Sequence, residues 1–147
     1  MTAASGRPAR RLLPVILCAL WVCFIWGNSL QPASVSGAHS GAATDLLARW
    51  LPWLTDHIVR KSAHFAEYAV LGALLAWVFY PLPGGVRPRL PLILLLGMSV
   101  PLADESIQLF VPGRSGRVQD VLLDLSGVLC ALALCAAIRA LVRRRRG

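Results

Sequence analysis

Four apolar blocks, each long enough to cross a membrane, constrain the fold of this chain more than any other feature. They cover residues 12–30, 63–82, 90–110 and 118–142. An α-helix of about 20 residues spans a hydrocarbon core of about 30 Å. Charged residues make up only 15% of the chain, against about 25% in soluble domains. The sequence therefore predicts an all-α, polytopic membrane protein, a bundle of four transmembrane helices in which the whole chain, 1–147, forms one domain.

The outer connection between the first two blocks carries a further prediction. Residues 27–43 are small and show no apolar periodicity, which predicts a loop. Residues 44–55 combine apolar positions at helical spacing with two tryptophans, so we expect a short helix lying at the membrane interface. Thr44 or Asp45 is its expected N-cap, and Pro52 is expected to bend or interrupt it.

The first block also has features of a secretory signal peptide, because it follows basic residues and precedes small ones. It is longer and richer in Trp than a usual signal core, so we expect it to remain as a helix. The cysteines lie inside the first and fourth blocks, without metal-ligand spacing. We expect them to pack between helices rather than to form disulfides; they are Cys18, Cys23, Cys130 and Cys135.

The charge distribution predicts an orientation in the cell membrane. The formal net charge is +8, but its placement fits membrane topology better than nucleic-acid binding. With a cytoplasmic N-terminus, ten of the fifteen basic residues lie inside: Arg7, Arg10, Arg11, Arg87, Arg89, Arg139 and Arg143–Arg146. The positive-inside rule then places both termini in the cytoplasm. All seven acidic residues and all three histidines fall in the outer half or the outer loops.

Three of the four predicted helices present one polar face each in their outer half. The residues are Lys61, His64, Glu67 and Tyr68 on the second helix, Asp104, Glu105 and Gln108 on the third, and Asp120 and Asp124 on the fourth. Glu67, Asp104 and Asp124 lie about 9 Å below the predicted outer boundary of their helices. Ionisable groups inside a span are costly and usually face protein or water. With Arg114 from the connecting loop, we expect these residues to line one outward-facing polar pocket.

Each of these residues also has a purely structural explanation. Lys61 at a helix end can extend toward the headgroups, and Tyr68 can belong to an interfacial aromatic belt. Asp120 can stabilise a helix N-terminus through its charge. A polar network that only locks the helices together is therefore an alternative to a binding pocket.

The sequence KSAHFAEYAVLG, residues 61–72, resembles the K-x-x-H-F-x-x-Y-x-x-L-G pattern of the VanZ-like family of small multi-pass membrane proteins. Residues 104–127 resemble the family's E-x-x-Q-x-F-x-P-x-R segment, which is followed by an aspartate and by Asn-x-x-Gly. Asp124 stands where the family usually has asparagine. The resemblance implies signature positions at Lys61, His64, Phe65, Tyr68, Glu105, Gln108, Phe110, Pro112, Arg114, Asp120 and Gly127.

The family is named for a member associated with low-level resistance to the glycopeptide teicoplanin. The resemblance implies a pocket that binds a cell-envelope or lipid-linked ligand, with a lipid-linked cell-wall precursor or a glycopeptide as candidate partners beside the membrane lipids. In such a pocket Lys61 and Arg114 are expected to pair with phosphate or carboxylate. No nucleic-acid partner is expected, and the oligomeric state stays open.

An intramembrane enzyme is an alternative function. The acid–base candidates are His64, Glu67, Glu105, Asp120 and Asp124, and the same set can hold a divalent cation such as Mg²⁺, Ca²⁺ or Mn²⁺. The sequence has no nucleophile elbow, H-E-x-x-H motif or phosphate-binding glycine loop. It therefore assigns no reaction and requires no cofactor. A transporter is disfavoured, because the polar groups are confined to one half of the helices.

Overall fold

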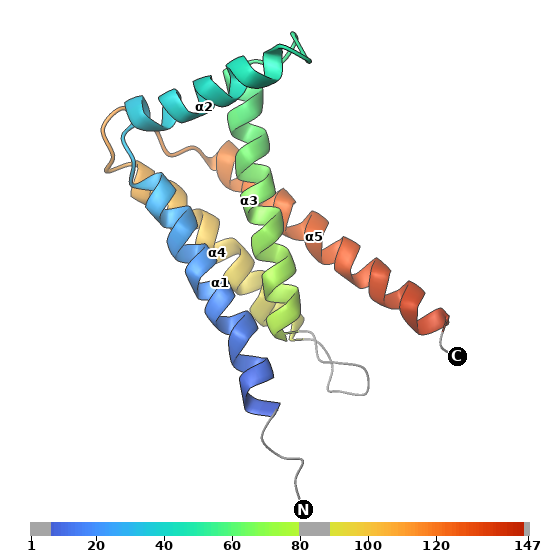
Figure 1. Cartoon of the computed structure of the whole chain (residues 1–147). Coiled ribbons are helices and arrows are strands. Elements are labelled where there is room, and N and C mark those ends of the chain that lie inside the picture. The colour runs from blue at the N-terminus through green and yellow to red at the C-terminus, as the bar shows by residue number, and fades with distance from the viewer. Residues whose placement is uncertain (1–6, 80–88, 146–147) are drawn as a thin grey trace, which may run out of the picture.

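Helix α3 (Asp56–Phe79) is the centre of the structure, because each of the other four helices contacts it. The computed structural model describes residues 7–79 and 89–145, with side chains from Leu12 onward. The other helices are α1 (Arg7–Ser29), α2 (Ala33–Ala48), α4 (Leu90–Gln108) and α5 (Val118–Arg144). Helices α1, α3 and α4 run side by side, α5 crosses α3 at an angle, and α2 lies across one end of the bundle (Figure 1).

Within residues 7–79 and 89–145, four helices are long and apolar enough to cross a membrane. They cover Leu12–Ser29, Asp56–Phe79, Leu90–Gln108 and Val118–Arg144. The prediction of an all-α fold with four candidate spans is confirmed. The predicted end of the second span at residue 82, together with Arg87 and Arg146, lies outside the described residues. The outer faces of these helices expose large apolar side chains such as Leu95, Leu122 and Leu134, as expected for surfaces that contact lipid.

The predictions for the connection after the first span are wrong in position. Residues 33–48 form α2 rather than a loop, and the helix expected at 44–55 ends at Ala48. Its alanines favour a helix even without an apolar stripe. Thr44 is not an N-cap: its hydroxyl donates to the Ser40 carbonyl at 2.8 Å, inside α2. Pro52 lies in the non-helical stretch that follows, because proline cannot donate to a helix.

Helix α3 begins at Asp56, earlier than the predicted span boundary at residue 63. The Thr55 hydroxyl accepts a hydrogen bond from the Ile58 amide at 3.4 Å, as an N-cap does. Asp56 in the first turn pairs with Arg60 at 2.5 Å, one turn later. Hydrophobicity alone placed the boundary too late, because the first turns of α3 are polar.

The crossing of α3 and α5 depends on two glycines. A Cβ atom at Gly72 would lie 2.6 Å from the Val128 carbonyl oxygen, and one at Gly127 would lie 2.5 Å from that of Phe65. Both distances are too short for any side chain, so the two backbones approach closely there. The buried apolar residues of the core surround this crossing: Ile25, Tyr68, Leu71, Leu75, Ala76, Ile93, Val100, Val128 and Leu132.

Two tryptophan indole groups of α1 form hydrogen bonds to the neighbouring helices. The Trp21 Nε1 group donates to the Glu67 carbonyl of α3 at 2.9 Å, and the Trp26 Nε1 group donates to the Val100 carbonyl of α4 at 3.4 Å. The four cysteines are free. Cys18 and Cys135 pack against the core, as predicted for all four, whereas Cys23 and Cys130 are exposed.

Candidate functional site

A polar cavity of about 120 Å³ opens at the α2 end of the bundle. Its lining residues come from the first turns of α3, the last turns of α4, the loop that joins α4 to α5 and the first turns of α5. Eleven of its twelve lining residues are polar or charged: His57, Arg60, Lys61, His64, Glu105, Gln108, Arg114, Ser115, Arg117, Asp120 and Asp124, with Leu123 as the apolar one. We call it the α3–α5 cavity. Its lining brings together side chains from three helices and one loop.

The rim of the α3–α5 cavity carries an ion pair between two helices. The Lys61 ammonium of α3 contacts the Asp120 carboxylate of α5, and about a third of each side chain is exposed. Arg60, which also lines the cavity, pairs with Asp56 on its own helix. A pair exposed to this extent contributes little to stability. The contact with Asp120 nevertheless keeps the Lys61 ammonium at the mouth of the cavity.

Arg114 ties the loop before α5 to the end of α1. Its guanidinium donates to the Gln31 carbonyl at 3.1 Å, to the Asn28 carbonyl at 3.2 Å and to the Gln108 side-chain oxygen at 3.5 Å. Burial lowers the pKa of Arg114 below its ordinary value, although a guanidinium stays charged near neutral pH. Arg114 therefore positions the cavity wall, as well as bringing positive charge to it.

Glu105 of α4 fixes the opposite side of the same loop. Its carboxylate accepts from the Arg117 backbone amide at 2.8 Å and from the Gln108 side-chain amide at 3.1 Å. The loop passes so close that a Cβ atom at Gly116 would lie 2.4 Å from the Glu105 carbonyl oxygen. The Glu105 side chain thus determines where Arg117 stands at the cavity.

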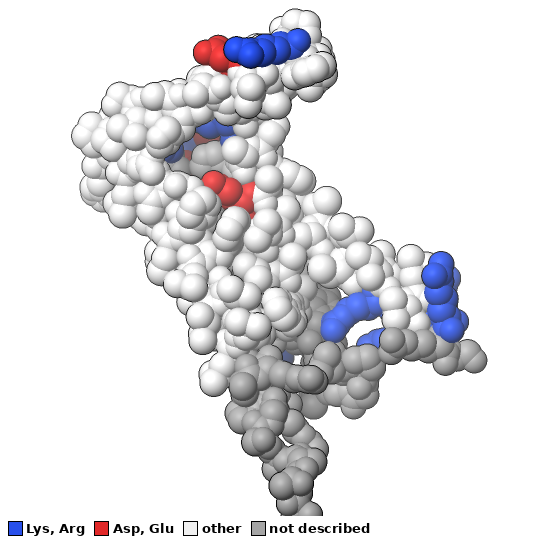
Figure 2. Space-filling model, viewed as in Figure 1, with Lys and Arg blue, Asp and Glu red and all other residues white. Residues whose placement is uncertain are grey.

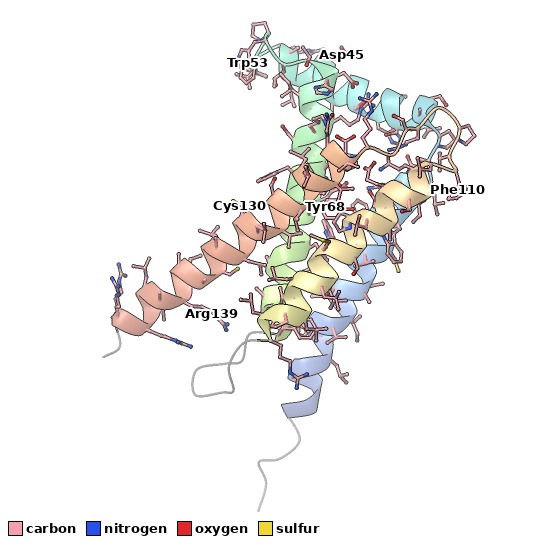
Figure 3. The ribbon with its side chains drawn as sticks, turned by 180° about the vertical axis from the view of Figure 1, so that it is seen from behind. Asp45, Trp53, Tyr68, Phe110, Cys130 and Arg139 are labelled. Carbon is pink, nitrogen blue, oxygen red and sulfur yellow. The ribbon has the colours of Figure 1, made fainter. Side chains whose placement is uncertain are left out.

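Beneath the cavity, a buried cluster joins α3, α4 and α5. One ligand-type atom each from His64, Asp104 and Asp124 lies within 4.8 Å of the others. His64 Nδ1 is 3.8 Å from the nearer Asp124 oxygen, and both aspartates have an exposed fraction of 0%. Tyr68, also fully buried, lies in the interior of the bundle where α3, α4 and α5 meet (Figure 3). The Gln108 side-chain amide donates to one Asp104 oxygen at 3.3 Å.

A second cavity, of about 240 Å³, lies on the other side of α3, between α1, α2 and α3. The Glu67 carboxylate faces it and accepts a hydrogen bond from the Asn28 side-chain amide at 3.1 Å. We call it the α1–α3 cavity. Figure 2 shows acidic and basic side chains gathered in a hollow below α2. Arg60, His64 and Arg114 line both cavities.

The structure divides the predicted pocket residues into three groups. Those on the α3–α5 cavity are Lys61, His64, Glu105, Gln108, Arg114, Asp120 and Asp124. Asp104 and Tyr68 are buried behind its wall. Glu67 has a similar predicted depth but points into the α1–α3 cavity, because its position on α3 is turned toward α1. The role of these residues in binding stays a prediction.

Several lining residues were not anticipated from the sequence. His57 and Arg60 come from the first turns of α3, which precede the predicted start of the span at residue 63. His57, Arg60, Lys61 and His64 are spaced so that they share one face of a helix that begins at Asp56. Thr55 and Asp56 form a recognisable helix start and would have signalled this. Arg117 lies beside the cavity because its backbone amide donates to the Glu105 carboxylate. Sequence patterns do not predict this contact.

Comparison with known proteins gives one family match. A model of the VanZ/LLP1 family matches residues 14–139. The match runs from the first turns of α1 into the last turns of α5 and includes both cavities. No curated protein and no solved structure matches the chain.

Proposed function

This chain belongs to the VanZ/LLP1 family, and we propose that it is a membrane protein that binds an anionic, lipid-linked ligand of the cell envelope in the α3–α5 cavity. The observation that carries the proposal is the set of basic side chains that line that cavity. Four basic residues, Arg60, Lys61, Arg114 and Arg117, stand against the three acidic ones, Glu105, Asp120 and Asp124. Phosphate and carboxylate are the groups that such side chains recognise.

The hydrogen bonds of these basic residues support binding of an added anion. The Arg114 guanidinium donates to carbonyl and amide oxygens, and within the part of the chain that the structure describes it forms no ion pair with a carboxylate. Arg117 is exposed, and Lys61 is in contact with Asp120 at a partly exposed rim. An arriving phosphate can draw on Arg60, Lys61 and Arg117 by rotation of long side chains, without any change in the helices.

The position of the cavity supports a ligand that is anchored in lipid. The exposed aromatic residues Trp50, Trp53 and Phe110 lie at the same end of the molecule as α2, as the labels for Trp53 and Phe110 show (Figure 3). Such residues favour the membrane–water interface. A ligand bound there would place its anionic head in the cavity and its apolar chain along the exposed leucines of the bundle.

The orientation is part of the proposal. The last turn of α5 carries Arg143 and Arg144, and it lies at the end of the bundle away from α2 (Figure 1). The positive-inside rule assigns such an end to the cytoplasm. The two cavities then face the exterior, where lipid-linked precursors of the cell wall and glycopeptides such as teicoplanin are found.

The test is a binding titration with the full chain in lipid nanodiscs. The probe is a long-chain polyprenyl phosphate, and the uncharged polyprenol of the same length measures the contribution of the apolar chain. We expect saturable binding of the phosphate and at least tenfold weaker binding of the polyprenol. Arg60→Gln and Arg117→Gln should each weaken phosphate binding by about tenfold, because each loses one charge-assisted hydrogen bond.

Arg49→Gln is the matched control. Arg49 is exposed at the same end of the molecule, directly after α2, but lines neither cavity. Equal loss of affinity in all three variants would show a general attraction of a positive surface and would contradict a specific site. Cells that carry the wild-type chain and each variant give a second readout, susceptibility to teicoplanin, which should follow the affinity for the lipid if the two are linked.

An enzyme acting on the same ligand is a second candidate. The position of the His64 imidazole, with Nδ1 3.8 Å from the Asp124 carboxylate, favours it, because a carboxylate beside an imidazole is a frequent acid–base arrangement. Incubation of the protein with the polyprenyl phosphate or its diphosphate, followed by mass spectrometry, tests this candidate. Release of phosphate that stops in His64→Gln would support catalysis, and an unchanged lipid would support binding alone.

A further inference from the structure

The buried cluster of His64, Asp104 and Asp124 has unusual hydrogen bonding. Within the described residues, six buried side-chain atoms lack a hydrogen-bond partner, and five of them belong to this cluster and the adjoining Tyr68. They are His64 Nδ1, the Tyr68 hydroxyl, Asp104 Oδ1 and both carboxylate oxygens of Asp124. A buried polar group without a partner is costly, and a buried charge without one is more so. A group bound among these atoms would supply the missing partners.

The basic side chains nearby do not provide hydrogen-bond or ion-pair partners for these atoms. Lys61 contacts Asp120, Arg60 pairs with Asp56, and Arg114 binds oxygens of the α1 end and of Gln108. Among the described residues, the ion pair recorded for Asp124 is the one with His64, and none is recorded for Asp104. The two fully buried carboxyl groups therefore have one group beside them that can carry a positive charge, the His64 imidazole.

We propose that His64, Asp104 and Asp124 bind a divalent metal ion. Two negative carboxylates balance a charge of +2, and the ion would take up the oxygen and nitrogen atoms that lack partners. Each ligand comes from a different helix, so the ion would join α3, α4 and α5 at one point. This proposal concerns the buried cluster and does not depend on which ligand fills the α3–α5 cavity.

The donor atoms indicate the kind of ion. One imidazole nitrogen and two carboxylate oxygens, without a thiolate, suit Zn²⁺ or Mn²⁺, whereas Ca²⁺ prefers six or more oxygens. Ligand atoms around Zn²⁺ lie roughly 3.4 Å apart when each bond is about 2.1 Å. The recorded separations of 3.8 Å and at most 4.8 Å therefore require the side chains to move inward by about 1 Å.

The site would keep an open coordination position. His64 and Asp124 line the α3–α5 cavity, whereas Asp104 closes the cluster from behind. Three protein ligands with a fourth position open to a cavity is the arrangement of zinc sites that bind water or substrate. The free position would point toward the basic residues of the rim. A bound ion would thus add a further positive charge where an anion is proposed to enter.

The experiment uses the full-length protein, treated with a chelator, dialysed and kept in detergent. Mn²⁺ is titrated and its free fraction is followed by electron paramagnetic resonance; Zn²⁺ is then tested by its ability to displace Mn²⁺. We expect one Mn²⁺ per chain and competition by Zn²⁺, with much weaker competition by Ca²⁺. Asp124→Asn, Asp104→Asn and His64→Gln should each lower the affinity by at least about tenfold.

Glu67→Gln is the matched control, because it removes a carboxylate of α3 that faces the other cavity and binds Asn28. It should leave Mn²⁺ affinity near that of the wild type. Thermal unfolding separates binding from folding. Asp124→Asn should retain or raise the melting temperature of the metal-free protein, because it replaces a buried carboxyl group whose oxygens have no hydrogen-bond partner, and should abolish the rise that Mn²⁺ gives to the wild type.

Absence of saturable Mn²⁺ and Zn²⁺ binding to the wild type would overturn the proposal, and so would equal affinity in wild type and Asp124→Asn. The outcome is independent of the lipid titration. A protein that binds polyprenyl phosphate in the presence of chelator, but binds no metal ion, refutes the metal site and leaves the proposed function intact. A protein that binds Mn²⁺ or Zn²⁺ but no polyprenyl phosphate supports the metal site and refutes the proposed function.

Discussion

Gly127 of α5 lies directly against the backbone of Phe65 in α3. A Cβ atom at Gly127 would be 2.5 Å from the Phe65 carbonyl oxygen and 3.2 Å from the Ala69 nitrogen. The neighbouring atoms are backbone, so they cannot rotate away. This contact sets the distance between α3 and α5, and it lies one turn from Asp124, so it also sets where the Asp124 carboxylate meets His64.

Gly127→Ala should therefore destabilise the protein by about 1–3 kcal/mol, the usual cost of overpacking. The control is Gly27→Ala in α1, where an added Cβ meets nothing within 4 Å. This change should be neutral or stabilise by about 0.5–1 kcal/mol, because alanine favours the helix. Thermal unfolding in one detergent compares the two variants. Equal stability of both would show that the α3–α5 contact is looser than described.

Trp21 is expected to contribute to the docking of α1 through its indole group. Trp21→Phe keeps the aromatic ring but removes the hydrogen bond to the Glu67 carbonyl, so we expect a loss of about 0.5–1.5 kcal/mol. Trp53→Phe, at a side chain that is 65% exposed, should leave the unfolding transition unchanged. A change of the same size in both variants would assign the effect to the aromatic belt and not to the hydrogen bond.

Arg114→Lys should loosen the junction of α1 and α2 although it preserves the charge. A lysine ammonium cannot match the fork that binds the Asn28 and Gln31 carbonyls together. Hydrogen exchange measured by mass spectrometry should become faster for peptides around residues 28–33. Arg117→Lys is the control, since the recorded Arg117 contact uses its backbone amide. Unchanged exchange in Arg114→Lys would show that the hydrogen bonds from Arg114 to the Asn28 and Gln31 carbonyls do not stabilise this junction.

The proposed orientation predicts labelling from opposite sides of the membrane. In a variant with the four native cysteines replaced by alanine, Asp45→Cys on α2 should react with a membrane-impermeant maleimide in intact cells. Arg145→Cys, after α5, should react only after the membrane is permeabilised. Labelling of Arg145→Cys in intact cells would place the C-terminus outside and would reverse the proposed topology.

The sequence predicted the spans well because lipid imposes a simple rule, a long apolar run, and residues such as Leu95 and Leu134 follow it. It failed where that rule does not apply. The small residues of α2 carry no apolar pattern, and the first turns of α3 are polar, so His57 and Arg60 fell before the predicted start of the span at residue 63.

The depth of the polar residues was easier to predict than their direction. Glu67, Asp104 and Asp124 were expected to face one pocket, yet Glu67 turns toward Asn28 of α1 and only the two aspartates lie in the buried cluster. Sequence spacing gives the direction of a side chain relative to its own helix. It does not give the rotation of that helix about its axis, which here depends on close contacts such as Gly72 against Val128.

The most direct test of the proposed function is a map, by electron cryomicroscopy, of the protein saturated with polyprenyl phosphate. We predict density for the phosphate in the α3–α5 cavity, within hydrogen-bonding distance of at least two of Arg60, Lys61 and Arg117. A phosphate bound elsewhere on the bundle, with the cavity unchanged from the lipid-free protein, would contradict the account.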